Sequence, residues 1–188
     1  LLPLLQRLRE SDGRVVVVAP GAELAMQTMR VVNAYKDDDL AAGAAIATSS
    51  HRRQRKRIQR STRLIVGTPD RLSEMLRARK LKGVSAIVLD EIEPILASRG
   101  AEFLDELLSR SQAGVQLVVA AATLGKRSEA FIERFMADGI RIHHADNPLQ
   151  NTISHHIVPT PAMGKEVVLV RFIKKNRCKP AIVFVSDP

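Results

Sequence analysis

The chain has few of the residues on which several common kinds of site depend. It contains one cysteine, Cys178, which excludes an internal disulfide framework and a cysteine-based zinc site and indicates a reducing, intracellular setting. Aromatic residues make up 3% of the chain and tryptophan is absent, so a surface that stacks nucleic-acid bases on aromatic rings is not expected. No apolar run approaches the roughly 20 residues of a membrane-spanning helix.

The sequence begins without a methionine, and its first residues do not resemble a signal peptide. Residues 1–5 are apolar, but they carry no basic leader and no small-residue cleavage site follows them. Leucines at helical spacing over residues 1–10 indicate that the sequence begins in the middle of a helix. We therefore expect that an upstream part of the protein is missing from this sequence.

Basic residues outnumber acidic ones, 29 to 20, which gives a net charge of +9. A surplus of this size favours a polyanionic partner, with nucleic acid first and an anionic membrane second. Because aromatics are scarce, we expect contact through arginines, helix ends and main-chain amides. The densest basic run, residues 51–57, is followed by Arg60 and Arg63. It has two interpretations, a solvated helix face or a second contact to RNA or a partner.

Short apolar runs alternate with amphipathic segments, which predicts an α/β fold with a parallel sheet flanked by helices. The expected strands are 14–19, 41–48, 63–67, 84–90, 115–122 and 140–143, and the expected helices are 1–10, 22–35, 69–79, 101–110 and 126–138. After an expected linker at 149–152, a strand at 153–158, a helix at 162–176 and a strand at 181–185 follow. We expect one domain at 1–148 and the beginning of a second at 153–188.

Two adjacent carboxylates follow one of these apolar runs. The expected strand 84–90 ends at Asp90, and Glu91 comes next. Ligands of open α/β sheets bind outside the carboxyl ends of the strands. Two acids placed there can hold Mg²⁺ and orient a water for attack on a phosphate. Taken alone, the plainer interpretation is an acidic strand end that leads into a turn, and the motifs on the other strands decide between the two.

Polar motifs stand at four strand ends in a fixed order. They are Pro20-Gly-Ala-Glu-Leu-Ala25, Gly67-Thr-Pro-Asp-Arg71, Asp90-Glu-Ile-Glu93 and Ala121-Ala-Thr123. In this order and spacing the chain resembles the DEAD-box RNA helicases over nearly its whole length. The resemblance implies a first RecA-like lobe of the P-loop NTPase type at 1–148, entered after its phosphate-binding loop, and the start of a second RecA-like lobe at 153–188.

The resemblance also implies cofactors and residue roles. ATP and Mg²⁺ would be the cofactors; Asp90 would hold Mg²⁺ through water, Glu91 would orient the attacking water as general base, and Thr123 would couple the nucleotide state to RNA contact. Helix N-termini, hydroxyls and a cation would hold the RNA sugar-phosphate backbone. The implied RNA-binding residues are Pro20, Gly21, Glu23, Gly43, Thr68, Pro69 and Arg71.

Several positions depart from the family pattern. Glu93 stands where the family has aspartate, and its longer side chain is expected to misplace the link to the Thr123 motif. Ala121 replaces a serine that the family uses for the same link. The other departures lie in the RNA-gripping motifs, with Gly21-Ala22 for Thr-Arg, Ala44 for a second glycine and Asp70 for glycine. An acid at position 70 would face phosphate, which is unfavourable by Coulomb's law.

Three functions are consistent with the sequence. The first is an ATP-dependent RNA helicase that acts on structured RNA in a ribonucleoprotein, such as an assembling ribosome. The second is a helicase-derived RNA-binding scaffold or assembly factor with weakened ATP turnover, since the hydrolytic acids are kept while the RNA-gripping residues have changed. The third is an unrelated P-loop ATPase with a basic surface. The phosphate-binding pattern G-x-x-x-x-G-K-[ST] is absent, so the chain alone is expected to be inactive, and the compartment (mitochondrial matrix, nucleolus or cytoplasm) stays open.

Overall fold

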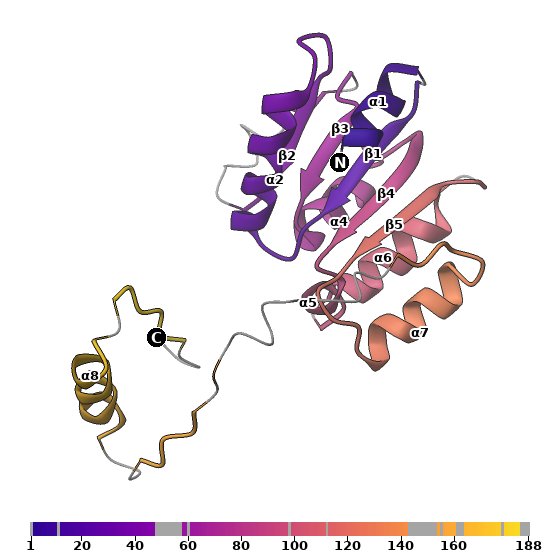
Figure 1. The fold of residues 1–188 in the computed structure, drawn as a ribbon. Coiled ribbons are helices and arrows are strands. Elements are labelled where there is room, and N and C mark those ends of the chain that lie inside the picture. Colours follow the sequence, from indigo (N-terminus) through magenta and orange to yellow (C-terminus); the bar gives the residue numbers. More distant parts are fainter. Residues whose placement is uncertain are drawn as a thin grey trace. The chain divides into compact units, whose positions relative to one another are not determined.

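The structure is a computed structural model that describes residues 2–10, 12–47, 58–59, 61–97, 99–111, 113–142, 154, 156–160, 164–177 and 179–184. The chain divides into two compact units, Leu1–Gly139 and Ile140–Pro188. Figure 1 shows the ribbon of both units. Among the described residues, none of the helices has the length and apolar character needed to cross a bilayer.

A five-stranded parallel sheet forms the middle of the first unit (Figure 1). Its strands are β1 (Arg14–Val18), β2 (Ala42–Ala45), β3 (Leu64–Gly67), β4 (Val84–Asp90) and β5 (Gln116–Ala120). They lie in the order β2-β3-β1-β4-β5, and every neighbouring pair is parallel. The predicted fold, a parallel sheet flanked by helices, is therefore confirmed.

Helices cover both faces of this sheet. They are α1 (Leu2–Glu10), α2 (Ala22–Tyr35), α4 (Pro69–Arg77), α5 (Ile92–Ala97), α6 (Gly100–Ser109) and α7 (Lys126–Phe135). Val16 and Val18 of β1 pack into one core with α4 to α7, whereas Val15 and Val17 pack into a second core with α1 and α2. Since both faces of β1 are covered, its sequence is apolar throughout instead of alternating. Each of these valines contributes about 1.5–3 kcal/mol by its burial.

One helix of the first unit is not predicted by the sequence pattern. α5 follows Glu91 directly and is only 6 residues long. Its buried residues Ile92, Ile95 and Leu96 pack into the core beneath the sheet end. α5 therefore fixes the C-terminal end of the turn at Asp90 and Glu91.

The predicted strand at 140–143 is wrong for its described part, 140–142, which has no regular structure. Ile140 and Ile142 are 90% and 92% exposed. Alternating apolar residues form a strand only where a neighbouring strand supplies hydrogen bonds. Within the described residues, β5 pairs with β4 alone, so residues 140–142 have no such partner.

The second unit contains one helix among its described residues, α8 (Lys165–Lys175), which confirms the helix expected at 162–176. The strands expected at 153–158 and 181–185 are wrong for the described residues of those ranges, which are irregular. Ile157, Ile182 and Phe184 are exposed there. A lone strand–helix–strand unit has no second layer on which to bury such side chains.

The two units meet in sequence after Gly139, whereas the first domain was expected to extend to residue 148. The expected linker at 149–152 lies outside the described residues. That residues 153–188 begin a second RecA-like lobe stays a prediction.

Candidate active site and nucleic-acid interface

The strand ends that carry the motifs lie at one edge of the sheet. Val18 at the end of β1 pairs with Gly67 of β3 on one side and with Leu89 of β4 on the other. Asp90 pairs with Ala120 of β5. The residues that follow these four strands, 19–21, 68–69, 91–93 and 121–125, therefore lie along the same edge, called the carboxyl edge below. Open α/β sheets bind their ligands at this edge.

Asp90 and Glu91 stand at the carboxyl edge beside the end of the central strand β1. Asp90 is the half-buried last residue of β4, and Glu91 is exposed. Glu91 has a φ of 59°, in the left-handed region that bulky residues rarely adopt. Such strain costs about 1–3 kcal/mol and persists only where the surrounding structure enforces it. The fully buried Ile92, the first residue of α5, holds the turn in place.

The two acids form a donor set that suits Mg²⁺. This ion binds one or two carboxylates and keeps several waters, completing its coordination with substrate phosphates. Among the described residues, no group of three or more histidine, cysteine or acidic side chains could enclose a metal. The pair therefore fits an ion that arrives with a phosphate ligand and does not form a complete protein cage.

Besides α5 and α7, the helices α2 and α4 begin at the carboxyl edge. Gly21 is the N-cap of α2, and Thr68 is the N-cap of α4, whose first residue is Pro69 as predicted. The Thr68 side chain makes no cap hydrogen bond, so its hydroxyl is not used to close the helix. First-turn amides and the positive end of a helix dipole attract anions. Both helix starts are therefore suited to phosphate groups.

The other predicted RNA-binding residues differ in placement. Pro20 is half-buried beside Gly21, and Glu23 is exposed in the first turn of α2. Arg71 pairs with Glu74 at 2.9 Å, so its charge is already partly neutralised within α4. Gly43 is buried inside β2 and does not reach the carboxyl edge. The structure thus brings together the residues that follow β1, β3, β4 and β5 but not Gly43.

Gly67 is a positioning residue that sequence reasoning missed. A Cβ at this position would lie 2.6 Å from the Ala45 carbonyl oxygen and 2.8 Å from the Ala45 Cβ. Only glycine lets the end of β3 approach β2 this closely and direct Thr68 to the edge. A glycine that closes a strand pattern is a known signal of close backbone approach.

Glu93 connects α5 with the start of α7. Its Oε1 accepts a hydrogen bond from the Gly125 amide at 2.5 Å and another from the Ser128 hydroxyl. The Gly125 amide is also 2.9 Å from the Ser128 oxygen. We call these three residues the Glu93 clasp. The sequence analysis expected Glu93 to misplace its link to the Thr123 motif, and the clasp joins Glu93 to the chain two and five residues beyond Thr123. The partners Gly125 and Ser128 were not predicted.

The clasp changes the acidity of Glu93. The Ser128 hydrogen bond is the largest cause that lowers the pKa of Glu93 from its usual 4.5, followed by the Gly125 amide. Partial burial opposes this shift, and the positive charge of Arg127 reinforces it. Glu93 therefore stays ionised at a lower pH than an isolated glutamate does.

The segment between β5 and the clasp is held at its two ends. Residues 121–124 are exposed and belong to no helix or strand. Thr123 has no hydrogen bond to another described residue. Because β5 fixes one end of the segment and Gly125 the other, the position of Thr123 depends on the clasp.

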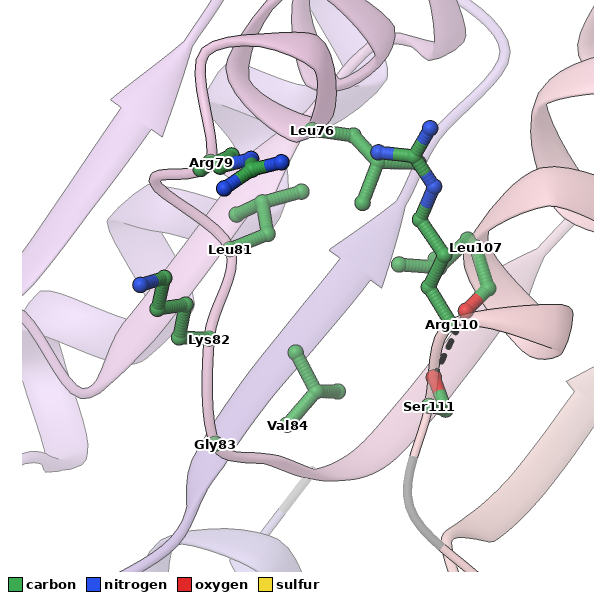
Figure 2. Close-up of a pocket in the computed structure, with 9 residues that line it drawn as sticks. All are labelled: Leu76, Arg79, Leu81, Lys82, Gly83, Val84, Leu107, Arg110 and Ser111. Carbon is green, nitrogen blue, oxygen red and sulfur yellow. Dashed lines mark hydrogen bonds between the residues drawn. The ribbon is translucent and has the colours of Figure 1, made fainter.

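A hollow of about 540 Å³ lies at the opposite edge, where β4 begins (Figure 2). Arg79, Lys82 and Arg110 stand around it, and none of the predicted site residues lines it. Arg79 and Arg110 lie at the C-terminal ends of α4 and α6, where positive charge offsets the helix dipole. Arg110 also pairs with Glu106 at 2.7 Å. The charges of Arg79 and Arg110 therefore stabilise the C-terminal ends of α4 and α6. The hollow is separate from the candidate site.

Acids at the end of a parallel strand, with helix N-termini at the neighbouring strand ends, are typical of α/β proteins that bind phosphate groups. The family model of the DEAD/DEAH box helicases matches residues 1–131. This chain belongs to the DEAD/DEAH box helicase family.

Two relatives illustrate the extent of the similarity. The "probable ATP-dependent RNA helicase YfmL" of Bacillus subtilis is 32% identical over 133 residues, which are 68% of this chain and 35% of that protein. The "DEAD-box ATP-dependent RNA helicase CshC" of Bacillus cereus is 28% identical over 195 residues, covering 100% of this chain and 49% of that protein. The chain therefore spans between a third and a half of the length of these curated relatives.

The fold has counterparts among solved structures. The crystal structure of a DEAD box protein from the hyperthermophile Methanococcus jannaschii matches with a TM-score of 0.63 and 20% identity. The match covers 68% of this chain and 36% of that one. At this identity the likeness concerns the fold.

Proposed function

We propose that this chain supplies the water-activating part of an ATP hydrolysis site in an RNA-dependent ATPase of the DEAD-box type. The observation that carries the proposal is the Asp90–Glu91 pair at the end of β4, where Glu91 is exposed in a left-handed conformation. Strained residues of this kind cluster at active sites. The position of Glu91 beside Asp90 at the carboxyl edge distinguishes it from Arg79, which has a similar φ of 54° at the opposite edge.

The two carboxylates have separate roles in this proposal. Asp90 holds Mg²⁺ through water, and the bound ion neutralises charge on the phosphates. Glu91 orients the attacking water and accepts its proton, which its exposed position permits. The sequence contains no G-x-x-x-x-G-K-[ST] pattern, so ATP binding needs a phosphate-binding segment outside it and the chain by itself is expected to be inactive.

RNA is the proposed polyanion at the carboxyl edge. The N-termini of α2 and α4 offer main-chain amides to the sugar-phosphate backbone, and Gly21 contributes its own. Pro20 and Pro69 have no N–H to donate, and in this proposal they shape the two helix starts that contact the RNA. The Thr68 hydroxyl makes no cap hydrogen bond and can donate one to phosphate. The names of the relatives, which describe RNA helicases, support this substrate class. Glu23, Gly43, Arg71 and Thr123 complete the proposed set, Thr123 as the coupling residue.

A second function is favoured by the way in which charge is placed along this edge. Arg71 is paired with Glu74, and the exposed Asp70 precedes it in the first turn of α4. Gly21-Ala22 supplies no cation. These features weaken the grip on phosphate and favour a helicase-derived scaffold or assembly factor of a large ribonucleoprotein, for example in ribosome assembly.

A coupled ATPase assay separates the two functions. We would assay the full-length protein with and without structured RNA, beside its Glu91→Gln variant. A catalytic role predicts a loss of kcat of roughly a hundredfold or more on substitution, with ATP binding retained. If the unsubstituted protein shows no hydrolysis above the variant while it still binds RNA, the scaffold function holds and the ATPase proposal is wrong.

A further inference from the structure

The amino edge of the sheet, where the strands begin, carries a concentration of positive charge. Segment 77–82, at the end of α4, contains four basic residues and no acid. A fifth basic residue, Arg110 at the end of α6, lies across the hollow of about 540 Å³ from Arg79 (Figure 2). All five residues are exposed. We call this set the basic rim, and it consists of Arg77, Arg79, Lys80, Lys82 and Arg110.

The backbone that carries most of the basic rim is fixed to the sheet by Arg14, the first residue of β1. Arg14 Nη1 donates hydrogen bonds to the carbonyls of Lys80 and Lys82, at 2.8 and 3.1 Å. Its Nε donates to the Thr62 carbonyl at 2.9 Å, just before β3 begins. The loop is therefore ordered before any ligand arrives, which reduces the entropy lost on binding.

The ends of α4 and α6 close without hydrogen bonds from arginine side chains. The amides of Arg79 and Lys80 donate to carbonyls in the last turns of α4, at 3.0 and 2.9 Å. The Ser111 hydroxyl donates to the Leu107 carbonyl of α6 at 2.7 Å (Figure 2). Arg79 has a φ of 54°, the left-handed position at which helices commonly end in glycine. The guanidinium group of Arg79 is therefore not needed to close α4 and is available to a ligand.

The charge of the basic rim is little neutralised inside the protein. Arg110 pairs with Glu106 at 2.7 Å, and among the described residues no acid pairs with the other four side chains. A surface of one sign that keeps its charge attracts a ligand of the opposite sign. The basic rim therefore favours an anionic ligand.

The chemistry of the hollow favours phosphate groups over a protein partner. Protein interfaces have an apolar core, but the apolar residues that line the hollow are at most 8% exposed: Leu76, Leu81, Val84 and Leu107. No aromatic ring lines the hollow, so bases have nothing to stack on. Guanidinium groups bind phosphate oxygens through paired hydrogen bonds, and lysines supply point charges. These features suit a sugar-phosphate backbone that is bound without regard to sequence.

The basic run at 51–57 joins the described fold beside the basic rim. The run itself lies outside the described residues, but Ile58 follows it directly and is buried in the same core as Leu81. The Gln59 amide donates to the Thr62 hydroxyl at 3.0 Å, and the Thr62 amide donates to the Gln59 carbonyl at 3.1 Å. Thr62 in turn accepts from Arg14, which holds the rim. Two adjoining basic segments favour a long polyanion over a single phosphate compound.

From these observations we propose that the basic rim binds the sugar-phosphate backbone of RNA at the edge of the sheet opposite the candidate active site. The proposal goes beyond the proposed function, which assigns RNA to the carboxyl edge, and rests on it only in taking RNA as the polyanion. A structured RNA that contacts both edges is held at two sites, so its affinity exceeds that of either edge alone. The contact needs no nucleotide and can be measured without ATP.

Lysine acetylation in the full-length protein, with and without a structured RNA hairpin, tests the contact directly. At an RNA concentration of about ten times Kd, acetylation of Lys80 and Lys82 should slow roughly tenfold, because only the unbound protein reacts at these amines. Lys36 is the control, since it ends α2 ahead of three aspartates and should react equally fast in both samples. Binding of the RNA with unchanged acetylation of Lys80 and Lys82 overturns this proposal alone. Absence of any RNA binding overturns the RNA assignment of the proposed function as well.

A variant of the basic rim measures its contribution to affinity. It combines Arg79→Gln, Lys82→Gln and Arg110→Gln. Affinity for the RNA hairpin should fall roughly tenfold, and the logarithmic salt slope should decrease by about 0.7 for each phosphate no longer neutralised. The control variant removes three exposed charges elsewhere, through Arg30→Gln, Lys165→Gln and Lys174→Gln. Equal losses in the two variants would assign the effect to overall charge and overturn the proposal.

Poly-glutamate serves as a second probe, because carboxylates also bind guanidinium groups. The proposal expects the rim variant to lose more affinity for the RNA hairpin than for poly-glutamate. If the variant binds the RNA as tightly as the unsubstituted protein does and loses affinity only for poly-glutamate, the surface takes an acidic polypeptide and the assignment to RNA is wrong.

Discussion

At the scale of single residues, the left-handed conformation of Glu91 links stability to function. A residue with a Cβ is strained there, whereas glycine is not. Glu91→Gly should raise the free energy of unfolding by roughly 0.5–1 kcal/mol and remove ATPase activity, because the carboxylate is lost. Urea unfolding and the coupled assay measure the two effects.

Arg79 provides the matched control for this substitution. It has a φ of 54° and lies at the edge opposite the candidate site. Arg79→Gly should stabilise the protein to a similar extent. A Glu91→Gly variant that is less stable than the unsubstituted protein would contradict the assignment of strain.

The second residue-scale prediction concerns the pH dependence that Glu93 confers. The folded state lowers the pKa of Glu93 below 4.5, mainly through the Ser128 hydrogen bond, so folding favours the ionised form. The stabilisation by Glu93 is therefore fully present above about pH 4.5 and is lost as the pH falls through the lower folded-state value. Denaturant unfolding at pH 6 and pH 3 should show Glu93→Gln less stable than the unsubstituted protein at pH 6, and this difference should be smaller at pH 3. A difference that grows on acidification would reverse the sign and refute the shift.

Sequence reasoning found the acids of the site but not the clasp. Asp90 and Glu91 could be predicted from the sequence because they close an apolar run. Such a run places them at the end of a strand, and no tertiary contact has to be known. The clasp joins residues 32 and 35 positions apart, and no local pattern pairs a glutamate with a distant serine. Gly67 had a local signal, but its role depends on the approach of Ala45 from another strand.

At the scale of the secondary-structure elements, α4 offers a test of how its N-cap residue, Thr68, is used. A working threonine N-cap contributes about 1 kcal/mol, but the Thr68 side chain makes no cap hydrogen bond. Thr68→Ala should therefore change the free energy of unfolding by less than about 0.5 kcal/mol. It should lower RNA affinity roughly two- to tenfold if the hydroxyl binds phosphate.

The control for this prediction is a threonine whose hydroxyl is used inside the protein. Thr28 donates to the Leu24 carbonyl at 3.0 Å within α2. Thr28→Ala should leave RNA affinity unchanged in fluorescence anisotropy. Equal losses of affinity in the two variants would show that the effect of Thr68 is indirect.

The helices predicted correctly are those whose apolar periodicity extends over several turns. The strands predicted correctly are those that have a neighbouring strand to pair with. The helix at 22–35 was bounded correctly because its apolar residues recur at helical spacing over 14 residues. α5 was missed because a helix of 6 residues contains too few turns to show a period. Residues 140–142 alternate as a strand does, but a strand also requires a neighbour, which local sequence does not report.

At the scale of the whole molecule, the net charge of +9 favours binding to RNA, and the next prediction concerns which basic residues make the contact. The basic run at 51–57 lies outside the described residues, and its contact with RNA stays a prediction. Replacing Arg52, Arg53, Arg55 and Arg57 by glutamate should lower RNA affinity and flatten its salt dependence, by roughly 0.7 in logarithmic slope for each RNA phosphate that the protein no longer neutralises. Binding titrations across a salt series measure this slope.

A second set of charge reversals serves as its control. Lys165, Arg171, Lys174 and Lys175 of α8 carry the same total charge. Their replacement by glutamate changes the net charge equally, so an equal decrease of slope would assign the effect to overall charge. An unchanged slope in the variant of the basic run would restore its interpretation as a solvated face.

The strand order has a consequence for the growing chain. β1 occupies the centre of the sheet, but its partners Leu64 and Ala86 are synthesised long after Val15. Protein synthesis adds about 5–20 residues per second, so the four valines of β1 are made several seconds before the strands that pair with them. A short β-branched run without charge is prone to self-association during such a delay. Among the described strands, β1 is therefore the one that is synthesised longest before its first partner.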